Sequence, residues 1–179
     1  MKKWLLTIAC LLFITNFVNA LSIDKNASKV EFNATKFGFV SVNGEFKDFS
    51  GEIVMNNNDI TKLNGSIRVD SVFSDNKKRD SHIRGENFFD SANFPQINFV
   101  MNKFEVLNKD ENKSSGKMQG VLNAHGVDKN VVLDFVLVKE EDYYKLQLNG
   151  NVNIKDDFNM ASSVIVNNDI KIVVNLVFK

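Results

Sequence analysis

Apolar residues recur at every second position along most of the chain after residue 28. This alternation is typical of β-strands that bury one face and expose the other. It is clearest from Ile170 to Phe178, where Lys171 and Asn175 fall on the outward face. The same pattern predicts strands near residues 30–34, 67–71, 97–101, 131–138 and 146–148. Clusters of Asn, Asp and Gly predict turns near residues 56–59, 108–116, 140–142, 156–159 and 167–169.

One polar segment, Asn76 to Glu86, lacks this alternation and is predicted to form a short helix plus a loop. About eight strands with one helical insertion fit a closed antiparallel barrel or a sandwich. Eight strands make the smallest barrel that either fills itself with side chains or holds one small ligand. Alternation alone does not choose between a filled and a hollow barrel.

The first twenty residues are typical of a secretory signal peptide. Lys2 and Lys3 precede the apolar run from Trp4 to Phe17, and Val-Asn-Ala at 18–20 provides a small-residue cleavage pattern. We therefore expect residues 1–20 to be removed and residues 21–179 to form one domain, located in the periplasm. Lipidation at Cys10 and an uncleaved anchor are the alternatives. Cleavage would remove the only Cys, leaving no disulfide or thiol chemistry.

Composition narrows the classes of function. The chain has 22 basic and 22 acidic residues among 179, which excludes a basic nucleic-acid binder, and 16 Phe supply apolar bulk for a core. The two histidines, His82 and His125, are far apart and have no third metal ligand spaced with them. No G-x-S-x-G motif occurs. We expect a binding protein with no catalytic residue, metal or cofactor.

Several motifs together resemble those of the YceI-like family of secreted, lipocalin-like proteins. Residues 79–83 (RDSHI) resemble its RDxHL element, and residues 88–90 (FFD) and 94–99 (FPQINF) resemble its FFD and YPxIxF elements. Residues 42–53 and 120–131 match further stretches, so the resemblance covers most of residues 28–179. Two departures are Lys36, where the family often has His, and Asn159, where a Gly usually follows Asp-Phe. We expect Arg79 and Asp80 to brace the helix and His82 to form a hydrogen bond at the end of the barrel.

The resemblance implies an all-β, eight-stranded, antiparallel, lipocalin-like barrel with one short helical insertion. It also implies a long-chain apolar ligand, such as a polyisoprenoid or a fatty-acid-like amphiphile, carried or sequestered in the interior. A homodimer and transient contact with membrane lipids are further expected partnerships. From strand alternation, the residues predicted to line the interior are Phe32, Phe37, Phe39, Phe46, Ile53, Ile67, Val69, Phe73, Ile97, Phe99, Met101, Leu122, Leu133, Phe135, Leu146, Leu148, Ile172 and Val174.

Two other classes of protein remain open at this point. A small outer-membrane barrel shows the same alternation with its faces reversed, although the predicted mature chain lacks Trp and has only Tyr143 and Tyr144 for aromatic girdles. A filled barrel that acts only as an interaction module is the other alternative. Separately, Asn26, Asn33 and Asn112 each satisfy N-x-S/T, and Asn112, then Asn26, are the candidate glycosylation sites.

Overall fold

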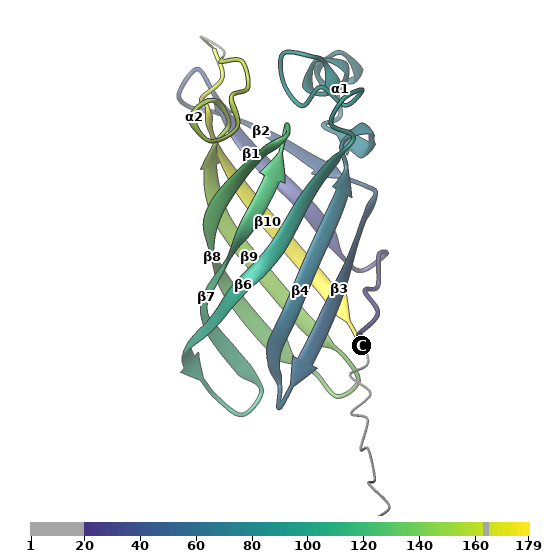
Figure 1. Cartoon of the computed structure of the whole chain (residues 1–179), viewed down its shortest axis with the longest axis vertical. Coiled ribbons are helices and arrows are strands. Elements are labelled where there is room, and N and C mark those ends of the chain that lie inside the picture. The colour runs from purple at the N-terminus through teal and green to yellow at the C-terminus, as the bar shows by residue number, and fades with distance from the viewer. Residues whose placement is uncertain (1–19, 163–164) are drawn as a thin grey trace, which may run out of the picture.

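The computed structural model describes residues 20–162 and 165–179, so all but the last residue of the predicted signal peptide lies outside the described residues. Within those residues, ten antiparallel strands form one sheet that curls into a barrel, in the order β3-β4-β6-β7-β8-β9-β10-β1-β2-β5 (Figure 1). The strands are β1 (Lys29–Lys36), β2 (Val40–Phe46), β3 (Phe49–Asn56), β4 (Asp59–Arg68), β5 (Val72–Phe73), β6 (Gln96–Lys109), β7 (Lys113–Ala124), β8 (Val127–Lys139), β9 (Tyr144–Asn153) and β10 (Asp169–Phe178).

The count of ten, against the expected eight, comes from two bent strands. β2 runs into β3, and β4 runs into β5 through a short 3-10 turn at Val69–Ser71. The Lys47 amide donates to the Ser71 carbonyl at 3.2 Å and the Arg68 amide to the Asp48 carbonyl at 2.9 Å, so pairing continues across both bends. If each bent pair is counted once, the described chain has the eight strands that alternation predicts.

The first described residues close the barrel at one side. β3 has a free edge away from β4, and the end of β10 extends beyond its pairing with β1. The Leu21 amide donates to the Ile53 carbonyl and the Asp24 amide to the Val177 carbonyl, both at 2.8 Å. The segment that directly follows the predicted cleavage site therefore fills the gap between β3 and β10.

The predicted helix is present as α1 (Lys77–Arg84). The Asn76 side chain caps its first turn by accepting a hydrogen bond from the Arg79 amide at 3.0 Å. Asp80, which is buried, accepts hydrogen bonds from the amide and hydroxyl of Ser74, while Arg79 Nε donates to the Ser74 hydroxyl at 2.7 Å. Arg79 and Asp80 thus fix α1 to the segment after β5, through Ser74.

A second helix, α2 (Ile154–Phe158), lies where the sequence predicts only a turn. The Asn153 side chain accepts from the Asp156 amide at 3.0 Å, and the Asp157 carboxylate accepts from the Asn153 amide at 2.8 Å. This reciprocal cap satisfies amides that an uncapped helix of this length would leave free. The described residues therefore contain two helical insertions and not the one expected, and both lie at the same end of the barrel (Figure 1).

The opposite end of the barrel is packed with side chains. Met118, Phe135, Leu146 and Phe178 are almost completely buried there. The rings of Phe104 and Phe135 stack with centroids 4.1 Å apart, which brings side chains of β6 and β8 into contact over the intervening strand β7. This half of the molecule is a closed hydrophobic core.

Candidate functional site

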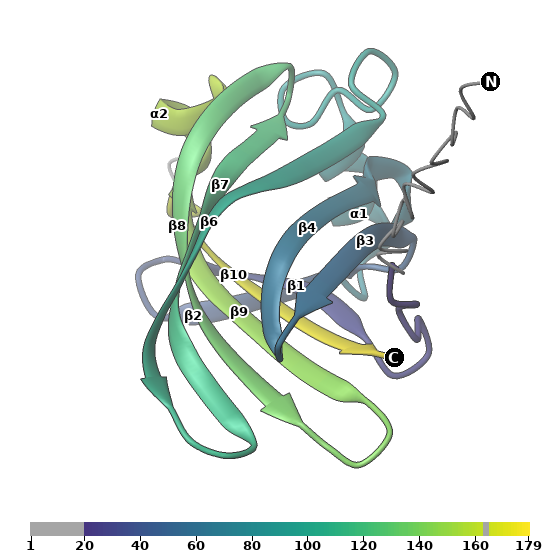
Figure 2. The ribbon, with the colours of Figure 1, turned by 60° about the horizontal axis from the view of Figure 1, so that its bottom comes forward.

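The half of the barrel next to α1 and α2 is hollow. Figure 2 shows the strands curling around a central space, and the side chains leave a cavity of about 1050 Å³ within it. Ligand pockets usually have volumes of roughly 300 to 1000 Å³, so this one is large. On β10 its lining runs from Ile170 to Leu176, which is roughly 20 Å along the strand at the usual rise per residue.

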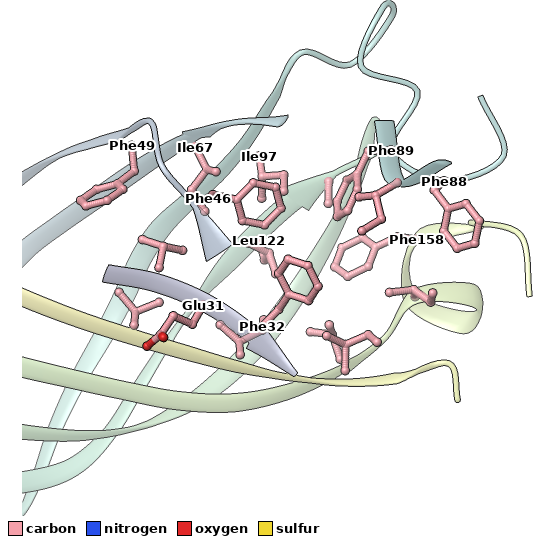
Figure 3. Close-up of a pocket in the computed structure, with 18 of the residues that line it drawn as sticks. Glu31, Phe32, Phe46, Phe49, Ile67, Phe88, Phe89, Ile97, Leu122 and Phe158 are labelled. Carbon is pink, nitrogen blue, oxygen red and sulfur yellow. The ribbon is translucent and has the colours of Figure 1, made fainter. Parts of the chain in front are cut away.

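Most of the cavity wall is apolar and comes from residues that alternate along the strands (Figure 3). Most neighbours of these positions point outward, as the alternation predicts, but Glu31, Ser66 and Asn98 also contribute to the lining. The sequence-predicted residues that the structure places in the wall are Phe32, Phe46, Ile53, Ile67, Ile97, Phe99, Leu122, Leu133, Leu148, Ile172 and Val174.

The other predicted lining residues lie elsewhere. Phe37, Phe39 and Phe73 have 58%, 81% and 40% of their surface exposed, because the first two belong to the turn between β1 and β2 and the third lies in the short strand β5. Their assignment to the interior is wrong.

The remaining four predicted residues, Val69, Met101, Phe135 and Leu146, do not line the cavity although they are buried or pack against the core. Phe135 and Leu146 belong to the packed end of the barrel, and Met101 packs against the core. Val69 is buried in the turn between β4 and β5 rather than in a strand.

Sequence reasoning missed the residues that form the cavity's upper part. Phe88 and Phe89 come from the loop after α1, and Phe158 and Met160 come from α2 and the segment after it (Figure 3). None of these segments alternates, so strand periodicity could not find them. The one sequence feature that pointed to this loop was the pair Phe88-Phe89 shortly after a polar helix, because two adjacent phenylalanines need a core in which to bury their rings.

Two large rings lie flat against the wall because glycine stands beside them. A side-chain Cβ at Gly44 would come within 2.2 Å of the Phe32 ring, which lies directly opposite in β1. A Cβ at Gly120 would come within 2.5 Å of the Phe99 ring. Both rings therefore occupy the space that a larger residue would fill, and the lumen between them stays open.

Polar residues gather around the end of the cavity near α1, and others, Glu31, Lys36, Ser50, Asn64, Ser66 and Asn98, contribute to the lining along the strands. Asn76, Lys78, Ser81, His82 and Glu86 contribute to the rim near α1. The His82 ring packs edge-on against Phe88 with centroids 4.7 Å apart, in place of the expected hydrogen bond. A ligand in this cavity would have an apolar part in the barrel and a polar part at this rim.

His125 is part of a different contact, at the turn between β7 and β8. Its Nδ1 lies 3.1 Å from the Phe158 carbonyl and its ring packs edge-on against Phe94. Among residues 20–162 and 165–179, no group of three or more His, Cys, Asp or Glu side chains is placed to hold a metal ion. No helix in this described part is long and apolar enough to span a membrane.

The family model for the YceI-like domain matches residues 21–178, so the chain belongs to the YceI-like family. The sequence is 31% identical over 109 residues to a UPF0312 protein of Yersinia pestis, a match that covers 58% of this chain and 54% of that protein. It is also 31% identical over 80 residues to a UPF0312 protein of Pseudomonas fluorescens, covering 44% and 40% of the two chains. The chain thus spans about half the length of the curated relatives it matches.

Solved structures show the same fold. The Campylobacter jejuni YCEI protein is 30% identical, with a TM-score of 0.66 over 78% of this chain and 85% of that one. BcnA of Burkholderia cenocepacia has a TM-score of 0.76 at 21% identity, covering 87% and 99%. A polyisoprenoid binding domain from Saccharophagus degradans, implicated in plant cell wall breakdown, has a TM-score of 0.71 at 14% identity, covering 89% and 98%.

Proposed function

We propose that this protein is a secreted, periplasmic carrier or sequestering protein for a long-chain apolar ligand, a polyisoprenoid or a fatty-acid-like amphiphile. The observation that supports this most is the hollow, apolar half of the barrel, which ends in a polar rim. Burying ten methylenes there would contribute about 8 kcal/mol before the costs of association. The likeness to a polyisoprenoid binding domain supports the same ligand class.

Secretion through a cleaved signal peptide at residues 1–20 is part of this proposal. The match to the family model begins at residue 21, and residues 21–24 form backbone hydrogen bonds to β3 and β10. A chain that begins at Leu21 would therefore keep every strand. N-terminal sequencing of protein recovered from the periplasmic fraction tests this proposal, and a first residue other than Leu21 would contradict the assigned cleavage site.

The outer face of the barrel favours a water-exposed protein over the outer-membrane alternative. On that face Lys117 pairs with Asp134 across β7 and β8, and Gln147 Nε2 donates to Asn175 Oδ1 at 3.3 Å across β9 and β10. Such pairs would face hydrocarbon in a membrane barrel, at a considerable free-energy cost. Release of the protein by osmotic shock is the expected result, and release only by detergent would favour the outer-membrane alternative.

The direct test of ligand binding is organic extraction of protein purified from its native host, followed by mass spectrometry of the extract. A long-chain lipid or isoprenoid recovered in near-stoichiometric amount is the expected result. Extracts that are reproducibly empty, together with no uptake of added fatty acid or isoprenoid, would support the filled-barrel interaction module instead.

Replacing Phe99 by Asp should abolish lipid retention. The Phe99 ring lies in the apolar wall, so an Asp there would place an unpaired carboxylate in the cavity and would lower the free energy of unfolding by about 3 to 5 kcal/mol. Val100→Asp is the matched control, because Val100 is the next residue of β6 and is 48% exposed. Retention should be lost in the first variant and kept in the second, as measured by lipid extracted per mole of folded protein.

A further inference from the structure

The turn between β1 and β2 exposes two phenylalanines at the rim of the cavity. Phe37 is 58% exposed, Phe39 is 81% exposed, and Val40 beside them is 42% exposed. The Phe37 amide donates to the Ile165 carbonyl at 2.8 Å, and Lys36 pairs with Val166. Because Lys36, Ile165 and Val166 line the cavity, the two exposed rings stand directly beside its edge, on the same end of the barrel as α1 and α2 (Figure 1).

The backbone of this turn is unfavourable for the residue it carries. Lys36 pairs with Val40, so the loop has three residues, and the Phe39 amide donates to the Lys36 carbonyl at 3.2 Å. Its first two residues, Phe37 with φ +53° and Gly38 with φ +78°, lie in the left-handed region, which Gly and Asn adopt most readily. A bulky residue at positive φ is a conformational outlier. Phe37 is thus exposed to water and also has an unfavourable backbone conformation. Neither property favours folding, so the combination points to a role in binding.

We propose that this turn, Lys36 to Val40, inserts into the surface of a lipid bilayer and so places the mouth of the cavity against the membrane. The apolar surface is continuous with the rim of an apolar cavity, which lets a lipid tail pass from one to the other without crossing water. Lys36 Nζ lies 5.0 Å from the centroid of the Phe37 ring. When the two Phe rings enter the bilayer, the Lys36 ammonium would therefore lie at the level of the lipid head groups. Docking to a bilayer depends on the turn alone. The use of this docking to load a ligand into the cavity rests on the proposed function.

A protein partner fits this surface less well than a bilayer. Stable protein interfaces bury about 800 Å² on each partner through roughly 20 to 30 residues a side. The turn offers only a few exposed apolar side chains on a narrow tip, which is the shape of an insertion loop. Two lysines of α1, Lys77 and Lys78, stand at the same end and have no carboxylate within ion-pair distance in the described chain, which favours anionic head groups.

The test is vesicle flotation of protein purified after expression of the full chain, with no ligand added. One vesicle preparation is phosphatidylcholine and the other is mixed phosphatidylethanolamine and phosphatidylglycerol. We expect the wild-type protein to float with vesicles, more strongly with the anionic mixture, and we expect Phe37→Asn and Phe39→Ser each to lower the partition coefficient by about tenfold or more. Leu107→Ser is the matched control, because Leu107 is equally exposed, at 58%, near the packed end of the barrel.

The Phe37→Asn variant separates docking from folding. Asn suits the left-handed position, so this variant should unfold at the same or a higher temperature than the wild type while binding vesicles more weakly. The proposal is overturned if the wild type fails to float with either preparation, if the Phe variants float as well as the wild type, or if Leu107→Ser lowers flotation equally. A wild-type dimer that Phe37→Asn dissociates, seen by sedimentation velocity without vesicles, would also overturn it in favour of a second copy of the chain. Because flotation measures docking of the turn and not the content of the cavity, these outcomes do not depend on whether extraction finds a lipid.

Discussion

At the scale of single residues, glycine opposite aromatic side chains keeps the lumen open. All three atoms closest to a Cβ built at Gly44 belong to the Phe32 ring, so the conflict is with one side chain and not with backbone. The ring lies between the sheet and the cavity. A methyl group at position 44 can therefore displace it only along the wall or into the cavity.

Gly44→Ala should reduce ligand retention several-fold and lower the free energy of unfolding by about 1 to 3 kcal/mol, the usual cost of overpacking. Titration with a fluorescent polyene fatty acid and denaturant unfolding measure the two effects. Ser41→Ala is the control, because Ser41 belongs to the same strand, is exposed and does not line the cavity. That variant should retain ligand and be about as stable as the wild type. Equal behaviour of the two variants would contradict this role for Gly44.

Residue-scale predictions from the sequence succeeded where a strand continues and failed where it turns. Phe32, Ile97 and Phe99 lie in uninterrupted strands, and strand parity assigned their side chains to the cavity. The same parity assigned Phe37 and Phe39 to the interior, although the chain reverses between them at positive φ. A Phe-Gly pair is not a typical hairpin signal, since Asn-Gly and Asp-Gly are the usual ones, so the turn could not be recognised from composition.

At the scale of elements, α2 depends on one carboxylate. Lys129 Nζ lies 2.5 Å from Asp157, whose side chain is only 16% exposed, and the Asn153 amide donates to the same carboxylate. The hydrogen bond from Lys129 is the main reason that the pKa of Asp157 lies below its usual value of 3.8. Asp and Asn are frequent both in turns and in helix caps, so the sequence could not distinguish this capped helix from the turn it predicted.

The lowered pKa of Asp157 makes part of the stability dependent on pH. Folding favours the charged carboxylate, so its contribution is present above about pH 4 and is lost as the pH falls through the lowered pKa of the folded state. Asp157→Asn should lower the free energy of unfolding by about 1 kcal/mol at neutral pH and should lose less stability than the wild type on acidification below pH 4. Lys129→Met should also reduce the loss of unfolding free energy on acidification, because it removes the hydrogen bond that lowers the pKa of Asp157. Denaturant unfolding across this pH range measures this loss, and parallel curves for wild type and both variants would contradict the assignment.

At the scale of the whole molecule, alternation predicted a barrel or a sandwich, the resemblance to the YceI-like family implied a barrel with a ligand inside, and neither predicted that only one half would be hollow. Alternation determines which side chains face inward, and the structure confirms an all-β barrel with that polarity. Whether the inward-facing side chains fill the interior depends on their size and direction at each height along the barrel axis. At one end Met118, Phe135 and Phe178 are almost completely buried, whereas at the other end Phe32 and Phe99 lie against glycines and line the cavity. Both ends have the same periodicity, so no sequence pattern separated them.

This division predicts that stability and ligand binding can be changed separately. Phe135→Ala would open a void in the packed half and should lower the free energy of unfolding by about 3 to 5 kcal/mol. Its affinity for a fluorescent fatty acid, measured well below the unfolding temperature, should stay within about threefold of the wild type, since Phe135 does not line the cavity.

Ile172→Ala should show the opposite balance. Ile172 lines the cavity and is only partly buried by protein, so truncation enlarges an existing space and should lower the free energy of unfolding by less than Phe135→Ala does, about 2 kcal/mol. The variant instead loses contacts to the ligand. The affinity of the protein for the fluorescent fatty acid should therefore drop by roughly tenfold, which corresponds to burying two or more methylenes. If Phe135→Ala weakened binding as much as Ile172→Ala, the two ends of the barrel would act as one cooperative core and the packed end would help to form the binding site.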